Sequence, residues 1–336
     1  MSKVNIKQLA KELNLSISTV SRALRDSYEI SADTKKKVFA LAKQLNYQPN
    51  PNASGLRGQK TKTIAVVIPE MVNDFFSLVI GGIEKVAQEQ GYYLLFYFTH
   101  GDYDLEVSFI NTLANGRVDG VLLSMSRENH DNSHLLELNK NGIPLVLFDR
   151  VSENLDNVKV TSDNYDSAIT ATRHLIDAGC KKIAYLQVHK NISIGKIRMN
   201  GYLEALRPKG QTPLMVECSN ENEETFEIIE KMLLNEKPDG IFASVEKLAV
   251  ICYRVCEKIN LRIPRDIKII SFSNLQTASL LNPSLTTITQ PAFDIGETAA
   301  KELLDIIHKK SKSASRDKHV ILKSLFIKRK STSALY

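Results

Sequence analysis

Two segments of this sequence recur about 120 residues further along the chain. RVDGVLLS begins at Arg117, and KPDGIFAS begins at Lys237. The apolar run IAVVI begins at Ile64, and its counterpart IAYLQ begins at Ile183. Self-similarity at a fixed period marks a repeated structural unit. The pattern therefore predicts two similar halves, in nearly the same register, within residues 62–336.

Within each half, short apolar runs alternate with longer helical segments. The first half contains the strand TIAVVIP, the helix FSLVIGGIEKVAQEQG, the strand YYLLFYFT, a helix near LEVSFINTLANG and the strand VDGVLLS. Strands separated by helices of this length form parallel, doubly wound sheets. Such sheets bind ligands beyond the carboxyl ends of their strands, which predicts a cleft between two α/β lobes. We expect the chain to cross between the lobes near residues 160, 290 and 320.

The first sixty residues differ in charge from the rest. Residues 1–62 carry twelve Lys and Arg but four Asp and Glu, whereas the remaining 274 residues carry 32 basic and 34 acidic groups. The excess positive charge thus lies in one small segment, as expected of a module that binds a polyanion. Its apolar spacing predicts three short helices: one in IKQLAKEL, one in ISTVSRALRD with Ser16 as N-cap, and one in ADTKKKVFALAKQLN with Ser31 as N-cap.

The second of these helices has a polar outer surface. Val20 and Leu24 face inward. The outer or leading edge consists of Ile17, Ser18, Ser21 and Arg22, with Thr19 nearby. Two short helices joined by a tight turn and braced by a third form a helix-turn-helix. A DNA major groove admits one helix whose leading residues offer donors, acceptors and small apolar contacts to base edges. Any three-helix bundle can carry polar residues there, but the basic excess favours DNA binding.

A proline-containing segment, QPNPNASGLRGQKTKT, follows the third helix. Pro49 and Pro51 end that helix, and Gly55 and Gly58 weaken any helix in NASGLRG. An isolated helix shorter than ~12 residues is marginal in water. For the unbound protein we therefore expect a flexible linker here.

The N-terminal segment resembles the DNA-binding segment of the lactose-repressor (LacI/GalR) family of bacterial transcription regulators. The family's turn appears here as LSISTVSR, its LNYxPN motif as LNYQPN, and its hinge residues as Ala53 and Leu56. The resemblance continues through VTSDNYDSAITATRHLIDAGCKKIAYL and NPSLTTITQPAFDIGETAAKELLDII and covers residues 3–330. It implies an all-α helix-turn-helix headpiece with a hinge helix, followed by a two-lobed α/β core with parallel sheets, like that of periplasmic sugar-binding proteins.

The resemblance also implies the domain organisation and the function. The expected parts are a headpiece (1–48), a hinge (49–61), a core (62–336), an N-lobe (about 62–160 and 291–320) and a C-lobe (about 161–290 and 321–336). The implied function is sequence-specific transcriptional regulation, with repression as the family's usual mode. A small-molecule effector, a sugar or a related metabolite, would bind between the lobes and control operator affinity. One reading helix per chain implies a homodimer on a palindromic operator. The C-terminus has no leucine heptads for a four-chain bundle.

The resemblance implies specific roles for particular headpiece residues. Ile17 and Ser18 would face bases, with Arg22 reading or bracing nearby. Leu56, near Ala53, would wedge into a minor-groove base step and kink the duplex. Ile17 departs from the polar residue common at its position and favours apolar contact, which leaves the operator sequence open. The positions expected to hold phosphates are Asn5, Thr19, Ser21, Ser31, Thr34 and Tyr47.

Several core residues are candidates for contact with the effector. Phe75 and Phe76 follow the first strand, where the family places aromatic or apolar groups, although core packing is an equal alternative. Asp149 ends the strand PLVLFD and can accept hydrogen bonds from hydroxyls, pair with Arg150 or cap a turn. Arg198, in IRMNGY, matches a family arginine and is the foremost effector candidate.

Two departures from the family pattern concern the cleft. The family often has an aspartate in a GYD or GFD run, but this chain has SFSN, so Ser273 takes its place as a candidate. The usual Asn-Asp pair after FAS is Val245 and Glu246. We therefore expect the cleft to lack a carboxylate and an amide that commonly bind sugar hydroxyls. This leaves open whether the effector is a conventional sugar.

Other functions require features that this sequence lacks. No apolar run approaches the ~20 residues of a membrane span, and the N-terminus has no apolar core of a signal peptide, as an exported solute-binding protein needs. An enzyme would require a nucleophile elbow, a phosphate-binding glycine loop or a metal-ligand cluster; Gly81 and Gly82 fall inside a predicted helix. Cys252 and Cys256 are one turn apart, which favours buried thiols over a metal pair. We expect a cytoplasmic protein with no catalytic activity, metal or cofactor.

Overall fold

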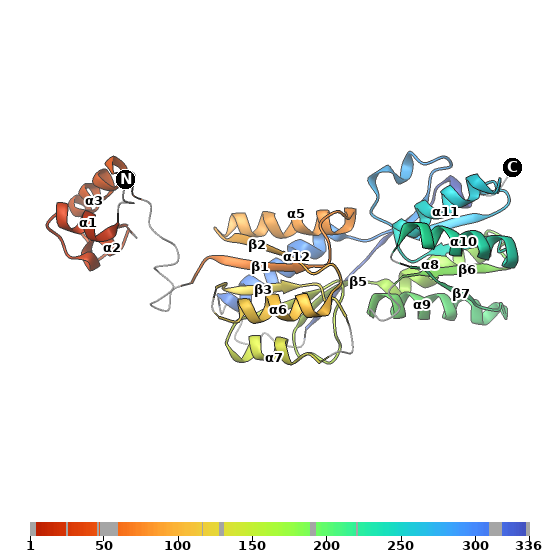
Figure 1. Cartoon of the computed structure of the whole chain (residues 1–336), viewed down its shortest axis with the longest axis horizontal. Helices are drawn as coiled ribbons and strands as arrows, with labels where there is room; N and C mark the ends of the chain where they lie inside the picture. The colour runs from red at the N-terminus through yellow and green to blue at the C-terminus, as the bar shows by residue number, and fades with distance from the viewer. Residues whose placement is uncertain are drawn as a thin grey trace. The chain divides into compact units, whose positions relative to one another are not determined.

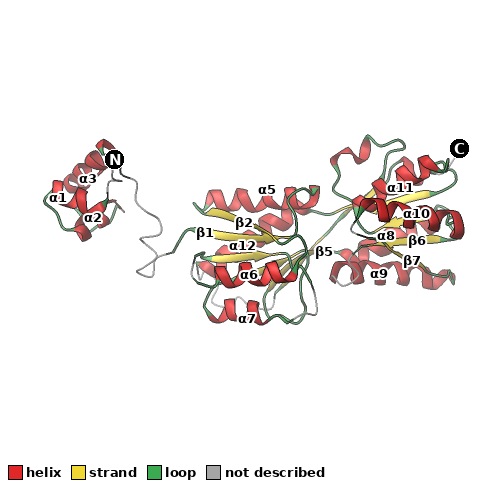
Figure 2. Cartoon of the chain, in the orientation of Figure 1, coloured by secondary structure: helices red, strands yellow, loops and turns green. Residues whose placement is uncertain are grey.

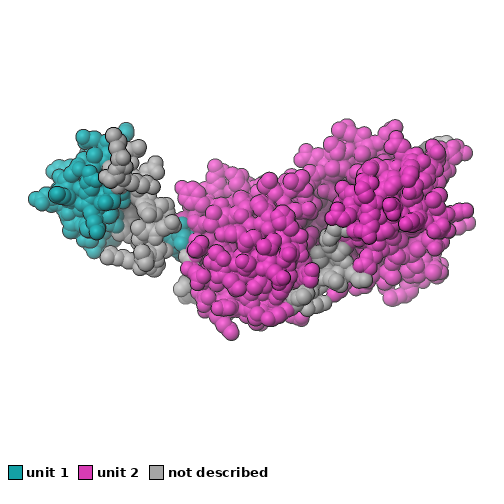
Figure 3. Space-filling model, viewed as in Figure 1, with its two compact units in different colours: residues 1–61 teal, residues 62–336 magenta. Residues whose placement is uncertain are grey.

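The structure is a computed structural model that describes residues 5–24, 26–45, 47, 60–115, 117–127, 131–188, 193–219, 221–308 and 318–333. They belong to two compact units, Met1–Thr61 and Lys62–Tyr336 (Figure 3). The hinge residues Ala53 and Leu56 lie outside the described residues.

The first unit contains the three predicted helices, α1 (Ile6–Glu12), α2 (Ile17–Leu24) and α3 (Ala32–Gln44). Capping residues fix where two of them begin. The Oγ of Ser16 accepts a hydrogen bond from the backbone N–H of Thr19, and the Oγ of Ser31 accepts one from that of Thr34. Both serines thus act as the predicted N-caps. Side chains from all three helices meet in one core, formed by Leu9, Ala10, Val20, Ala23, Val38 and Ala42.

The second unit has two lobes, and a six-stranded parallel sheet forms the centre of the N-lobe. The sheet order is β11-β5-β4-β3-β1-β2. The strands are β1 (Thr63–Ile68), β2 (Tyr93–Phe98), β3 (Gly120–Leu123), β4 (Leu145–Phe148), β5 (Val158–Ser162) and β11 (His319–Leu322). One face is covered by α5 (Asp74–Glu89) and α12 (Ala292–Ile307), and the other by α6 (Tyr103–Leu113) and α7 (Ser133–Lys140) (Figures 1 and 2).

The C-lobe repeats this plan with the sheet order β12-β10-β9-β8-β6-β7. The strands are β6 (Ile183–Gln187), β7 (Leu214–Glu217), β8 (Gly240–Ala243), β9 (Lys268–Phe272), β10 (Thr286–Thr289) and β12 (Leu325–Ile327). One face is covered by α8 (Asn164–Asp177) and α9 (Ser193–Leu206), and the other by α10 (Asn222–Glu236) and α11 (Glu246–Lys258). Short 3-10 turns occur at Arg207–Lys209, Gln276–Ser279 and Lys330–Thr332. Cys252 and Cys256 are buried thiols in this core, as predicted.

The sequence repeat corresponds to a repeat of sheet register. Ile64 of β1 pairs with Gly120 of β3, and Ile183 of β6 pairs with Gly240 of β8. The glycines occupy equivalent places in the two sheets, which confirms the prediction of two similar halves.

The chain passes between the sheets after β5, after β10 and again between β11 and β12. At the last passage only two residues separate Leu322 from Leu325. A strand that leaves the first sheet at its carboxyl edge enters the second sheet at the carboxyl edge too. β12 therefore runs antiparallel to β10, whereas the other strand pairs of the two sheets are parallel, as predicted.

The paired glycines Gly81 and Gly82 serve helix packing in the N-lobe. A Cβ atom added to Gly82 of α5 would lie 2.1 Å from the carbonyl oxygen of Phe293 in α12, whereas one added to Gly81 would meet only the Phe293 ring, at 3.7 Å. Gly296 of α12 is in the reciprocal position, since its added Cβ would lie 2.0 Å from the carbonyl oxygen of Val79. The two helix backbones therefore approach each other more closely than any residue other than glycine allows.

We expect Gly82→Ala to lower the free energy of unfolding by about 2 kcal/mol, because the helices must separate to admit the methyl group. Gly81→Ala is the matched control and should be neutral or slightly stabilising, since alanine favours the helix. Chemical denaturation of both variants measures the difference. Equal stability of the two variants would contradict the close-packing account.

Candidate functional site

Helix α2 exposes most of the side chains expected to read DNA. Ile17 is 46% exposed, Ser18 and Arg22 are exposed, and Thr19 and Ser21 are half-buried. The Oγ of Ser16 lies 2.7 Å from the Oγ of Ser18 and 2.8 Å from the Oγ1 of Thr19. Hydroxyls both donate and accept, so the start of α2 offers a linked group of adaptable hydrogen-bonding atoms beside one apolar side chain.

Arg22 is held by an ion pair at the surface. Its Nη1 lies 2.8 Å from the Oε2 of Glu29, and both side chains are about half exposed. Exposed pairs contribute little stability. The pair therefore orients the guanidinium without preventing it from binding a base edge or a phosphate.

The other described positions expected to hold phosphates lie mainly at helix starts. Asn5 caps α1 by accepting a hydrogen bond from the backbone N–H of Gln8, and the Oγ of Ser31 lies 2.9 Å from the Oγ1 of Thr34 at the start of α3. Tyr47 packs against the headpiece core, and burial raises the pKa of its hydroxyl. Their contacts with phosphates stay a prediction.

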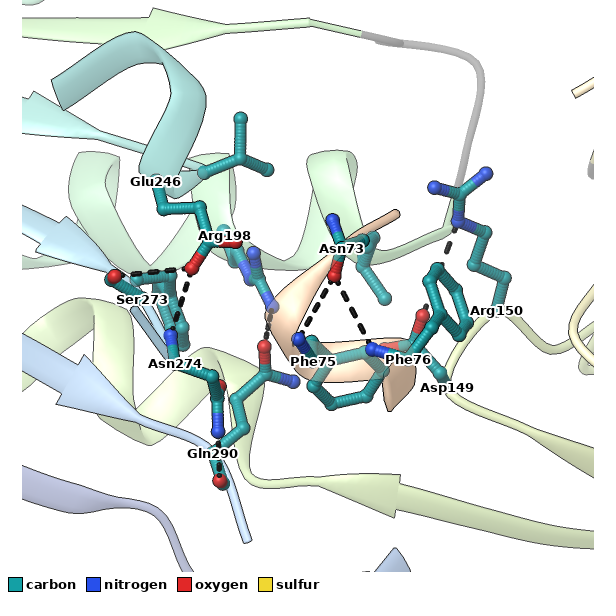
Figure 4. Close-up of a pocket in the computed structure, with 13 residues that line it drawn as sticks. Asn73, Phe75, Phe76, Asp149, Arg150, Arg198, Glu246, Ser273, Asn274 and Gln290 are labelled. Carbon is teal, nitrogen blue, oxygen red and sulfur yellow. Dashed lines mark hydrogen bonds and ion pairs between the residues drawn. The ribbon is translucent and has the colours of Figure 1, made fainter. Parts of the chain in front are cut away.

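In the second unit, a pocket of about 60 Å³ lies between the lobes, at the carboxyl ends of the strands (Figure 4). It brings together all five predicted effector residues, namely Phe75, Phe76, Asp149, Arg198 and Ser273. The other lining residues are Asn73, Arg150, Ile194, Val245, Glu246, Phe272, Asn274 and Gln290. Both lobes and the segment after β10 thus contribute to one cavity.

Phe75 and Phe76 lie at the pocket and pack in the N-lobe core at the same time. The Oδ1 of Asn73 accepts hydrogen bonds from the backbone N–H groups of Phe75 and Phe76, which fixes the first turn of α5 at the pocket. Both rings line the pocket and also belong to the N-lobe core, where they meet edge to face with centroids 5.2 Å apart. Their contact with a ligand stays a prediction.

Arg198 is the centre of a buried polar network. Its guanidinium donates to the Oδ1 of Asn164 at 2.7 Å, to the carbonyl oxygen of Ser244 at 2.6 Å and to the Oε1 of Gln290 at 3.0 Å. Its Cζ lies 3.7 Å from the ring centroid of Phe272. Burial lowers the pKa of Arg198 to about 10, so the side chain keeps its charge at neutral pH. The network ties α8, α9, β8 and the segment after β10 to one side chain.

Asp149 and Arg150 close the pocket on the N-lobe side. Asp149 has φ 57°, in the left-handed region that aspartate tolerates better than most residues. Burial raises the pKa of its carboxyl group, against the opposing effects of the Arg150 and Arg198 charges. The Nε of Arg150 lies 4.0 Å from the Oδ2 of Asp149, and burial lowers the pKa of Arg150. Pairing with Arg150 is one of the three roles that the sequence suggested for Asp149.

The expectation that the cleft lacks a carboxylate and an amide is wrong. The Oε2 of Glu246 accepts hydrogen bonds from the Oγ of Ser273 at 3.1 Å and from the backbone N–H of Asn274 at 3.0 Å (Figure 4). Burial raises the pKa of Glu246. The start of α11 and the end of β9 meet at the same sheet edge, so that Glu246 and Asn274 together supply the two groups. The signal was present in the sequence, because Glu246 is itself acidic at the position of the family's aspartate.

Comparisons with known families agree with this architecture. A model described as periplasmic binding proteins and sugar-binding domain of the LacI family matches residues 61–329. A second, described as bacterial regulatory proteins of the LacI family, matches residues 5–50. The chain belongs to the LacI family. As a LacI-family protein it is a DNA-binding transcriptional regulator with an effector-binding core.

Individual relatives extend the match over nearly the whole chain. Catabolite control protein A of Priestia megaterium is 30% identical over 93% of this chain and 95% of its own. A crystal structure of the lac repressor dimer, bound to operator and the anti-inducer ONPF, covers 99% of this chain and all of its own, with a TM-score of 0.86 and 22% identity. A LacI-family regulator from Enterococcus faecium with bound ribose covers 82% of this chain and all of its own, with a TM-score of 0.73 and 28% identity.

The described residues include neither a membrane-spanning helix nor a cluster of metal ligands. Within this part of the chain, the helices are too short or too polar to span a bilayer. The same residues contain no group of three or more His, Cys, Asp or Glu side chains placed to hold a metal ion.

Proposed function

We propose that this LacI-family protein is a homodimeric repressor whose affinity for a palindromic operator is controlled by a small hydroxylated metabolite in the pocket between the lobes. The observation that carries the proposal is the composition of this pocket. Its lining comes from both lobes and includes Gln290, in the segment that connects them. A ligand bound there would contact both lobes and one of the segments that connect them.

Gln290 links the pocket to the segments that connect the lobes through its hydrogen bonds. Its Nε2 donates to the Oγ of Ser162 at the end of β5, its Oε1 accepts from Arg198, and its carbonyl oxygen accepts from Asn274. A ligand that competes for Arg198 or Asn274 therefore alters hydrogen bonds at two of the three crossings. Operator affinity changes only if the ligand has different affinities for the two lobe arrangements.

The homodimer is supported by the exposed edge of the N-lobe sheet. β2 is an edge strand, and its Tyr93, Leu95 and Phe96 are 75%, 42% and 37% exposed. An apolar edge strand with unpaired backbone groups readily pairs with another chain. We propose that this edge is part of the dimer interface, and that two headpieces thereby read two half-sites.

On the DNA, we propose that Ile17, Ser18 and Arg22 contact bases and that Leu56 wedges into the minor groove. Asn5, Thr19, Ser21, Ser31, Thr34 and Tyr47 would hold phosphates, and Ala53 would belong to the hinge that carries the wedge. The effector residues would be Phe75, Phe76, Asp149, Arg198 and Ser273. The protein would act in the cytoplasm, where operator DNA is found, and would release its effector unchanged rather than turn it over.

Binding to promoter DNA over a range of salt concentrations tests the DNA-reading part of the proposal. The expected result is a footprint on a palindromic site and an affinity that falls steeply with salt, because bound phosphates release counterions. A binding curve unaffected by salt would contradict it. Thermal shifts against sugars, sugar acids and nucleobases test the effector part, and the absence of any stabilising compound would remove the basis for effector control.

A further inference from the structure

A smaller cavity adjoins the pocket and has a different charge. It measures about 30 Å³ and is lined by Arg150, Val188, Ile194, Gly195, Arg198, Ser244 and Val245. It shares both arginines with the main pocket. Two guanidinium groups and no carboxylate are thus found among the described residues that line it.

Two buried polar atoms at this cavity have no hydrogen-bond partner within the described part of the chain. They are the Nε of Arg150 and the Oγ of Ser244, whose residue is 3% exposed. Burial raises the pKa of the Tyr185 phenol, and the Ser244 hydroxyl lies close enough to lower that pKa in part, so the atom that clearly lacks a partner is the Nε of Arg150. Leaving a buried donor unpaired is costly, and the cost is greater for a charged group. Arg198, by contrast, already donates to three partners. The arginine available for a ligand is therefore Arg150.

The start of α9 lies at the same cavity. Ile194 and Gly195, which line it, belong to the first turn of this fourteen-residue helix. The first N–H groups of a helix have no partners inside the helix, and together with the helix dipole they favour an anion.

The carboxylates near Arg150 lie outside the lining of the smaller cavity. Asp149 is the carboxylate closest to Arg150, with a separation of 4.0 Å, and its charge is shared with Arg198. Glu246 accepts hydrogen bonds from Ser273 and Asn274, and Figure 4 shows it well apart from Arg150. The Glu70 carboxylate, which is exposed, also acts on Arg150. Among the described residues that line the smaller cavity itself, the charged groups are two arginines.

We propose that this cavity, the anion subsite formed by Arg150, Arg198, Ser244 and the first turn of α9, binds an acidic group of the effector. The effector is then a phosphorylated or carboxylated sugar-like metabolite rather than a neutral sugar. The inference rests on the proposed function, because it specifies the ligand of the same pocket. Phosphate and carboxylate share the required chemistry: both accept charge-assisted hydrogen bonds from a guanidinium and from helix N–H groups.

Calorimetric titration of the full-length protein with matched compounds tests the proposal. The probes are glucose, ribose and fructose, each with its phosphate and its sugar acid, and inorganic phosphate as a competitor. In at least one set, an acidic member should bind at least about tenfold more tightly than its neutral parent, the loss expected when a hydrogen bond to a charged group is absent. Inorganic phosphate should weaken binding of that acidic member. The phosphate and acid arms show which anion fits.

Arg150→Gln should abolish the preference, so that the acidic member and its neutral parent bind this variant with equal affinity. Arg173→Gln, the same change at an exposed position on α8, is the matched control and should preserve the preference. If Arg150→Gln does not fold, Ser244→Ala provides the second variant, since it removes one hydroxyl from the subsite and should reduce the same preference.

The experiment distinguishes failure of the anion subsite from failure of the proposed function. Neutral sugars that bind as tightly as all their acidic forms, or a preference that persists in Arg150→Gln, would overturn the anion subsite and leave the proposed function intact. A wild-type protein that binds none of these compounds, with inorganic phosphate also without effect, would overturn both.

Discussion

Replacement of Arg198 by methionine is expected to weaken effector binding about 1000-fold, the range seen when one partner of a buried, hydrogen-bonded charge is removed. The substitution retains a long side chain but removes the three donors to Asn164, Ser244 and Gln290. It also removes the cation that lies over the Phe272 ring. The variant should therefore bind its operator without responding to the effector. Calorimetry with the tightest-binding compound of the panel measures the first effect, and operator titration measures the second.

Retained operator binding shows that the Arg198→Met protein is folded, so that the two readouts control for each other. Arg198→Lys keeps the charge but not the fork of donors, and should recover a small part of the affinity. An Arg198→Met protein that still binds the effector like the wild type would show that the ligand lies elsewhere.

The double substitution Arg22→Ala and Leu56→Ala is expected to reduce operator binding to the level of non-specific DNA, a loss of about 10³-fold or more. Arg22 carries a charge-assisted contact on the exposed face of α2. Leu56 is expected to wedge into the minor groove, although it lies outside the described residues. Loss of the wedge removes the kink that allows further protein contact. Fluorescence anisotropy with operator and scrambled duplexes measures both affinities.

Arg173→Ala, on an exposed position of the core, is the matched control for loss of one positive charge. It should leave operator affinity unchanged, and both proteins should bind the effector like the wild type. Undiminished discrimination between operator and scrambled DNA in the double variant would show that another surface reads the sequence.

The fold could be predicted because its determinants are local or periodic. Ser16 and Ser31 precede amphipathic runs and fix where two headpiece helices begin. The repeat starting at Ile64 and Ile183 reflects identical strand pairing in the two sheets. The antiparallel direction of β12 was not predicted, because it follows from where the chain crosses between lobes and not from the sequence of the strand.

The pocket could be predicted only in part. Arg198 and Asp149 follow from motif positions, and the structure brings them to one cavity. Gln290 was missed because its role depends on three partners that are far apart in sequence. Glu246 was missed although it is acidic at the position of a family aspartate. Its contacts with Ser273 and Asn274 arise only because the start of α11 meets the end of β9.

The close contact between α5 and α12 could not be predicted either, because it also depends on residues that are far apart in sequence. Gly81 and Gly82 are visible in the sequence, but their different roles depend on where Phe293 lies in a helix more than 200 residues away. Long-range packing of this kind leaves no spacing pattern around the glycines.

The central claim is that a ligand between the lobes changes how tightly the protein binds its operator. Operator affinity of the full-length dimer, titrated with the compound that stabilises it most in the thermal-shift panel, tests this directly. The account predicts a change of about 5- to 150-fold at saturation, the usual range of coupling between two sites, and no change in Arg198→Met. A compound that saturates the pocket while operator affinity stays constant would contradict it.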